Sequence, residues 1–125
     1  HEIGVAFASK GIPIGEIIVS EYCRSWKTAN IAFGEWTIKD SRLNFLPYKD
    51  YTEDHIALMK KNAMPLLTRP PLPGTNTIII GHDDPFEAAT GIYPEPQGIA
   101  FILQPDGGKS FKIIGSVLPS EWATL

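Results

Sequence analysis

The sequence predicts one α/β domain with a largely parallel sheet and a C-terminal antiparallel hairpin. Segments typical of strands alternate with segments typical of helices along most of the 125 residues, a pattern that favours parallel sheets. The apolar segment 77–81 ends directly before His82, at the position where open α/β sheets bind their ligands. Strands over 99–104 and 111–117 are joined by the turn-forming residues 105–109, which favour a hairpin.

The first expected elements are a helix over 1–11, a strand over 16–19 and a helix over 22–33. The first helix has apolar residues at helical spacing and ends at a glycine, but no capping residue precedes it. We therefore expect that residues are missing upstream. The strand is rich in β-branched residues, and Ser20 is placed to cap the helix that follows. The expected core stripe of that helix is Tyr22, Trp26, Ala29 and Phe33.

The middle of the chain holds a candidate strand over 42–46 within a polar stretch. The segment 52–67 predicts a helix, because a threonine and two acidic residues open it and apolar residues follow at helical spacing. These apolar residues are Ile56, Met59, Ala63 and Leu67. The proline-rich segment 69–74 is expected to be an extended connector, too short to separate two domains, that leads into the strand 77–81.

A short helix is expected after His82. Asp84 is placed as its N-cap, Pro85 suits the first helical position and Glu87 would complete a capping box. Gly91 suits the exit, because glycine readily adopts the left-handed conformation that ends many helices. His82 is therefore expected between the end of a strand and the start of a helix.

Charge and composition argue against several classes of partner. The net charge of −3 gives no general basic field, so a nucleic acid held by its phosphates is not expected. No apolar run reaches the length of about 18 residues that a membrane span needs. Cys23 is the single cysteine, which excludes an internal disulfide and leaves the compartment open between bacterial cytoplasm and export.

Arg24 and His82 follow two different strands of the expected sheet. Arg24 falls in the first turn of its helix, where the positive helix end disfavours a cation by up to ~1 kcal/mol. A bound anion would reverse this effect and would also accept amide hydrogen bonds. The alternative is an exposed arginine that turns toward Glu21 or solvent. If parallel strands bring the two junctions together, Arg24 and His82 converge on one crevice.

Other interpretations of the residues near His82 stay open. His82 itself could satisfy backbone carbonyls in a turn, and Asp83 is either a solvated loop residue or a proton donor near the crevice. A metal site made of His82, Asp83 and Asp84 is conceivable, but adjacent side chains seldom point at one ion. His55 is expected at the surface, and nothing supports a catalytic role for His1.

The chain resembles the histidine phosphatase superfamily, also called phosphoglycerate-mutase-like. The resemblance covers nearly the whole chain and rests mainly on three motifs: Ser20-x-x-Cys23-Arg24-x-x-x-Thr28-Ala29 after a strand, Ile80-Gly81-His82, and Glu87-Ala88-Ala89-Thr90-Gly91. It implies a three-layer α/β/α domain that binds a phosphoryl group without a metal or other cofactor. One histidine of that family forms a phosphohistidine, and a second stabilises the phosphoryl group during transfer.

The resemblance implies roles for individual residues. Arg24 matches a phosphate-binding arginine, and His82 matches the second, non-nucleophilic histidine. Asp83 follows the histidine as the proton donor does in the acid-phosphatase branch. Asp50, Glu53 and Asp54 are the candidates if the mutase branch is the better guide. The Arg-His-Gly or Arg-His-Ala motif that supplies the nucleophile does not occur in 1–125, so we expect it in the missing upstream segment and expect this domain to be incomplete.

We therefore expect the complete protein to be a metal-independent phosphatase acting on a small phosphorylated substrate or a phosphoprotein. The 125 residues alone are expected to be inactive, because neither Arg24 nor His82 replaces the nucleophile. The second hypothesis is a non-catalytic phosphate-binding or interaction domain of the same fold. A third and weaker one is a metal-dependent hydrolase that uses His82 and Asp83. The sequence leaves the oligomeric state undecided.

Overall fold

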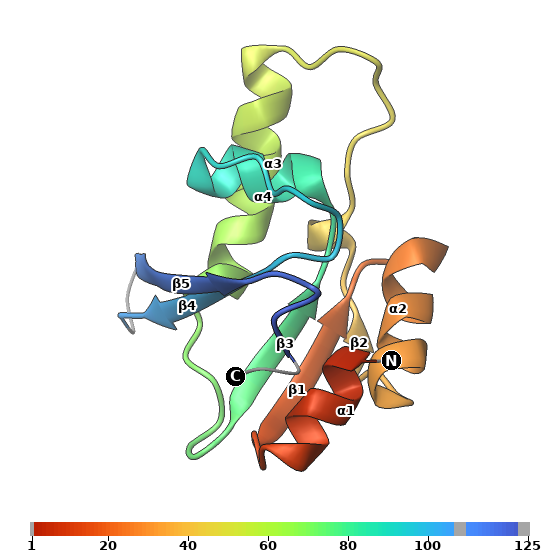
Figure 1. Ribbon diagram of the computed structural model, residues 1–125. Coiled ribbons are helices and arrows are strands. Elements are labelled where there is room, and N and C mark those ends of the chain that lie inside the picture. The colour runs from red at the N-terminus through yellow and green to blue at the C-terminus, as the bar shows by residue number, and fades with distance from the viewer. Residues whose placement is uncertain (1, 107–109, 123–125) are drawn as a thin grey trace.

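A computed structural model describes residues 2–106 and 110–122 and has a mixed α/β fold, with a parallel three-stranded sheet and a separate antiparallel hairpin (Figure 1). The α/β class and the hairpin predicted from the sequence are therefore confirmed. His1 and the centre of the predicted turn at 107–109 lie outside the described residues. In chain order, the elements are α1 (Glu2–Ser9), β1 (Ile14–Val19), α2 (Cys23–Phe33), β2 (Ile38–Lys39), the 3-10 helix η1 (Ser41–Leu43), α3 (Glu53–Leu67), β3 (Asn76–Ile80), α4 (Asp83–Thr90), β4 (Ala100–Pro105) and β5 (Phe111–Val117).

The three strands of the main sheet are parallel and lie in the order β2-β1-β3. Val19, the last residue of β1, pairs with Lys39 in β2 and with Ile80 in β3, and these two residues also end their strands. The three carboxyl ends therefore share one edge of the sheet. Whatever follows them in the sequence is brought together there, which is the general reason that parallel sheets bind ligands at this edge.

Both faces of β1 are buried. Ile17 and Val19 pack with Ala29 of α2 in one apolar cluster. Ile18, whose side chain points to the opposite face because strand residues alternate, packs with Leu66 of α3. This burial on both sides explains why the strand is almost continuously apolar.

The predicted helical stripes are confirmed in part. Ala29, Met59, Ala63 and Leu67 are buried, while Trp26 and Phe33 are partly buried and pack against the cluster around Ala29. Tyr22 and Ile56 are exposed instead. Tyr22 precedes the first turn of α2 and turns toward the edge of the sheet, where it contacts Phe45.

The hairpin β4–β5 forms a sheet of its own (Figure 1). Phe101 in β4 packs on Phe86 of α4, with the two ring centroids 4.8 Å apart. Val117 in β5 lies in a buried cluster with Ala6 of α1 and with Trp122. Within 2–106 and 110–122, β3 pairs with β1 alone, so its other edge has no strand partner.

The strand predicted over 42–46 is wrong. The only strand in this region of the described chain is β2 at Ile38–Lys39, and η1 follows at once. Asp40 stabilises this turn instead of a strand. Its carboxylate accepts a hydrogen bond from the Arg42 backbone amide (2.9 Å) and forms an ion pair with the Arg42 guanidinium (2.7 Å). Such local side-chain bonds compete with strand pairing.

The predicted start of α3 is confirmed, and Thr52 is its N-cap. The Thr52 hydroxyl accepts a hydrogen bond from the His55 amide (3.2 Å), and the Thr52 amide donates to His55 Nδ1 (3.1 Å). A histidine thus takes the place that glutamate or glutamine holds in the usual capping box.

Replacing Thr52 with alanine is expected to lower the free energy of unfolding by about 1 kcal/mol, because the hydroxyl that caps the His55 amide is lost. Thermal unfolding followed by circular dichroism measures the loss. The control is Thr52→Ser, which keeps the hydroxyl and should retain most of the stability. Equal midpoints for all three proteins would contradict the capping role.

Candidate functional site

The candidate site lies where β1 and β3 end. Ser20 follows β1 and His82 follows β3 after one glycine, so the parallel sheet brings both residues to the same edge. Ser20 Oγ and His82 Nε2 share a hydrogen bond of 2.7 Å. The two junctions that the sequence marked as polar are therefore neighbours in the structure.

Ser25 forms hydrogen bonds to the ends of both β1 and β3. Its hydroxyl accepts a hydrogen bond from the Ser20 amide (2.9 Å) and donates to the Ile80 carbonyl. The side chain is buried on the same face of α2 as Ala29, four residues later. This role of Ser25 was not predicted, although a serine one helical turn before a core alanine is a signal that the sequence contains.

Ser20 is not the cap of α2, contrary to the prediction. Tyr22 is the N-cap, and it makes no side-chain capping bond. Ser20 is completely buried, and its hydroxyl accepts from the Tyr22 amide (3.3 Å) while it bonds His82. The Ser20 hydroxyl thus makes a local bond, with the Tyr22 amide, and also a bond across the sheet, with His82.

Arg24 lies in the first turn of α2 and is exposed. This exposure agrees with the predicted alternative, an exposed arginine that turns toward Glu21 or solvent. The Glu21 carboxylate accepts a hydrogen bond from Asn44 Nδ2 (2.9 Å). No ion pair within 2–106 and 110–122 involves Arg24. Its positive charge nevertheless acts on His82, since it contributes to lowering the pKa of that imidazole.

His82 is half-buried, and its pKa lies below the ordinary value of 6.5. Burial is the main cause, because it penalises the charged imidazolium, and the charge of Arg24 acts in the same direction. The carboxylates of Asp83 and Asp84 oppose the shift without overcoming it. The neutral form of His82 is therefore favoured at neutral pH in the free protein.

The prediction that Asp84 caps the helix after His82 is wrong. His82 is the N-cap, without a side-chain capping bond, and α4 begins at Asp83. The capping box predicted with Glu87 is therefore not formed. Both aspartates lie in the first turn, where negative charge is favourable. The predicted exit is confirmed, since Gly91 ends the helix with a φ of 78°.

The two aspartates have different tyrosine partners. Asp83 Oδ2 accepts a hydrogen bond from the Tyr93 hydroxyl (2.9 Å), and Asp84 Oδ2 accepts one from the Tyr51 hydroxyl (3.0 Å). Burial and the bond to Asp84 raise the pKa of Tyr51 to about 12, so its phenol stays protonated. Asp84 is therefore engaged in holding the 46–51 loop, while Asp83 lies next to His82 on the exposed side.

The rings of Tyr22 and Phe45 pack edge-on against His82. These contacts were not predicted from the sequence. The His82 ring centroid lies 4.9 Å from that of Phe45 and 5.5 Å from that of Tyr22, and the two aromatic rings are 4.6 Å apart. Phe45 comes from the polar stretch after β2, which has no periodicity that would mark it. Both rings contact the half-buried imidazole.

A metal site at His82, Asp83 and Asp84 gains no support. No group of three histidine, cysteine, aspartate or glutamate side chains in the described part of the chain is arranged to hold a metal ion. The two carboxylates are instead directed to Tyr93 and Tyr51.

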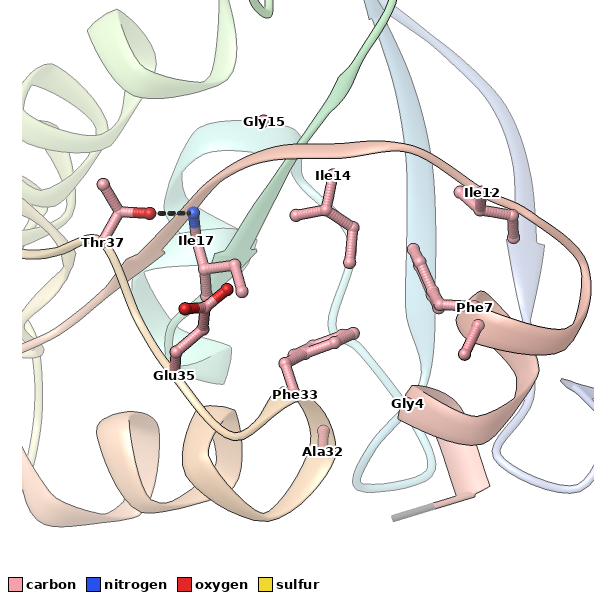
Figure 2. A pocket seen from close by; sticks show the side chains of 11 residues that line it. Gly4, Phe7, Ile12, Ile14, Gly15, Ile17, Ala32, Phe33, Glu35 and Thr37 are labelled. Atoms are coloured by element: carbon pink, nitrogen blue, oxygen red, sulfur yellow. Dashed lines mark hydrogen bonds between the residues drawn. The ribbon is translucent and has the colours of Figure 1, made fainter.

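A cavity of about 310 Å³ lies elsewhere, between α1, the amino half of β1 and the end of α2. Figure 2 shows Phe7, Ile14 and Phe33 around it, with Glu35 and Thr37 at one side. Arg24, Ser20 and His82 do not line this cavity. The candidate site is therefore separate from this cavity.

The fold and the site define an α/β protein with a polar cluster at the carboxyl edge of a parallel sheet. No family model, curated protein or solved structure matches the chain. Among the described residues, no helix is long and apolar enough to cross a bilayer.

Proposed function

We propose that the complete protein is a phosphatase of the histidine phosphatase type. A histidine outside this chain accepts the phosphoryl group and then passes it to water, while Arg24 and His82 bind the phosphoryl oxygens. The observation that carries the proposal is the meeting of two strand ends, at which Ser20 and His82 share a hydrogen bond of 2.7 Å and Arg24 opens the adjoining helix.

The chemistry of phosphoryl transfer matches these groups. Such a transfer needs positive charge and hydrogen-bond donors around the equatorial oxygens. Arg24 has a permanently charged planar guanidinium that fits phosphate, and the N-cap residue of its helix, Tyr22, makes no side-chain capping bond. A phosphate dianion near His82 would favour the imidazolium, which adds a charged donor. Asp83, adjacent to His82, is the proposed proton donor to the leaving oxygen.

The three-layer α/β/α arrangement is part of this proposal. Burial of Ile17 and Val19 against α2, and of Ile18 against α3, supports a sheet between two helical layers. The edge of β3 that has no strand partner in residues 2–106 and 110–122 offers a place for a further parallel strand. The carboxyl end of such a strand would bring a histidine beside His82.

A non-catalytic phosphate-binding domain is the second candidate, because the same Arg24 and His82 would serve it. The two candidates differ only in the nucleophile. An Arg-His-Gly or Arg-His-Ala motif in the upstream coding sequence favours the enzyme, and its replacement favours binding alone.

The direct test is hydrolysis of p-nitrophenyl phosphate by the full-length protein, with and without EDTA. We expect steady release of p-nitrophenol that the chelator leaves unchanged, and a phosphorylated histidine in the quenched enzyme by mass spectrometry. Loss of activity with EDTA would favour the metal-dependent alternative. Phosphate binding without any hydrolysis would favour the binding domain.

Replacing Arg24 with alanine is expected to lower kcat/KM for this substrate by roughly 10²–10³-fold, the usual effect of removing one charge-stabilising donor. Arg24→Lys should recover only part of the loss, because an ammonium lacks the planar fork. The matched control is Arg69→Ala, which removes an exposed arginine paired with Glu16 at 2.9 Å. Equal kinetics for the Arg24 and Arg69 variants would refute the assignment.

A further inference from the structure

His82 is flanked by what we call the aromatic wall, the rings of Tyr22 and Phe45. The two rings contact each other and both present edges or faces to the imidazole. Tyr22 keeps 36% of its surface exposed, and Phe45 is partly exposed. Part of this ring pair is therefore accessible beside His82, at the edge where the substrate is proposed to bind.

The aromatic wall is held in place by hydrogen bonds on both sides. The Tyr22 hydroxyl donates to the Phe45 carbonyl (3.3 Å). Glu21 and Asn44, the residues before them, exchange two bonds, from the Glu21 amide to Asn44 Oδ1 (3.0 Å) and from Asn44 Nδ2 to the Glu21 carboxylate (2.9 Å). These bonds tie the loop after η1 to the start of α2. The wall is thus a fixed surface, and a ligand need not order it.

The charges near the wall are mostly negative. The carboxylates of Asp83 and Asp84 and the guanidinium of Arg24 act electrostatically on His82, and the Glu21 carboxylate lies beside the wall, bonded to Asn44. Two other cations at the end of β2 are already engaged. Lys39 Nζ lies 4.7 Å and 5.0 Å from the ring centroids of Trp26 and Trp36, and Arg42 is paired with Asp40 at 2.7 Å. A second anionic group on a substrate held near His82 would therefore meet the negative charges of Asp83 and Asp84.

We infer that the site prefers phosphate monoesters whose organic group is a flat aromatic ring without a further negative charge. The inference rests on the proposed function. The phosphate engages Arg24 and His82, and the ring packs on the aromatic wall. In the reaction, the ester O–P bond breaks, the phosphoryl group passes through the upstream histidine to water, and the leaving oxygen takes a proton from the acid. The products are the free alcohol or phenol and inorganic phosphate.

The test compares esters of similar leaving-group chemistry with the full-length protein. Benzyl phosphate and propyl phosphate both release a primary alcohol, and we expect kcat/KM to favour the benzyl ester by about tenfold, since one aromatic contact has that magnitude. Adding a carboxylate to the ring, as 4-carboxybenzyl phosphate, should lower kcat/KM severalfold. Replacing Phe45 with leucine, which keeps the apolar volume, should reduce the preference for benzyl over propyl.

The matched control is Tyr48→Leu, because that exposed ring stacks on His55 at 4.3 Å and lies outside the aromatic wall. Its ester preference should equal that of the wild type. Equal kcat/KM for the benzyl and propyl esters would overturn the inference while leaving the phosphatase proposal intact. An unchanged preference in Phe45→Leu would also overturn it. Failure to hydrolyse any of the three esters would instead refute the phosphatase and the inference together.

Discussion

Replacing His82 with alanine in the full-length protein is expected to lower kcat for phosphomonoester hydrolysis by roughly 10²–10⁴-fold, the range for loss of a group that exchanges protons or charge with the transition state. His82 is the residue that joins the two strand ends through Ser20 at 2.7 Å. In the proposed mechanism, its removal deletes a hydrogen-bond donor to the transferring phosphoryl group.

The pH dependence of anion binding gives a second readout for the same residue. Burial, with help from Arg24, holds the pKa of His82 below 6.5 in the free site, so neutral His82 contributes stability that is present above pH 6.5 and is lost as the pH falls through the folded pKa. If His82 binds anions as proposed, tungstate, an analogue of phosphate, is expected to raise that pKa. Tungstate affinity should therefore increase as the pH falls below about 6.5, and His82→Ala should flatten this dependence.

The matched control removes the other histidine of the described chain. His55→Gln keeps a side chain that can complete the capping box with Thr52, so stability and kcat should both stay near wild type. Isothermal titration with tungstate and steady-state kinetics check the two readouts. A full rate in His82→Ala, or an equal loss in both variants, would remove His82 from the mechanism.

Local sequence patterns were sufficient for most elements of the fold. β-Branched runs located β1 and β3, and a capping threonine located the start of α3. The predicted ends of elements were wrong where several polar residues are consecutive in the sequence. Asp83 and Asp84 both suit a helix start, and the chain begins α4 one residue before the predicted cap. The strand predicted at 42–46 does not form, because the bonds that Arg42 donates to the Asp40 carboxylate favour a 3-10 turn.

The sequence allowed one feature of the candidate site to be predicted, namely that residues after parallel strands meet at the carboxyl ends of those strands. This alignment brings His82 and the start of α2 together, as expected. The bonds of Ser20 to His82 and of Ser25 to Ile80 join residues 62 and 55 positions apart, and no local pattern encodes such partners. Phe45 lies in a segment without periodicity, so its packing on His82 depends on the path of a loop. The catalytic roles themselves stay predictions.

Replacing Gly4 with alanine is expected to have the largest effect on stability, a loss of about 1–3 kcal/mol typical of an overpacked interface. A methyl group on Gly4 would overlap the backbone carbonyl oxygen of Ala32 in α2, and a backbone atom cannot rotate away as a side chain can. Helix α1 would have to move off α2. That movement would disturb Phe7, whose ring lies 5.4 Å from Phe33 and 5.1 Å from Trp122.

The overlap at Gly4 competes with the higher helix propensity of alanine, which favours the variant by up to ~1 kcal/mol. A net loss therefore requires that the contact with Ala32 outweigh propensity. The control is Gly115→Ala in β5, where the added methyl would meet only the tip of Ile102 at 4.0 Å. Thermal unfolding should show a midpoint lower by roughly 3–5 °C for each kcal/mol lost in Gly4→Ala, and a much smaller change in Gly115→Ala. A midpoint at or above that of the wild type for Gly4→Ala would mean that α1 does not pack on α2 through this glycine.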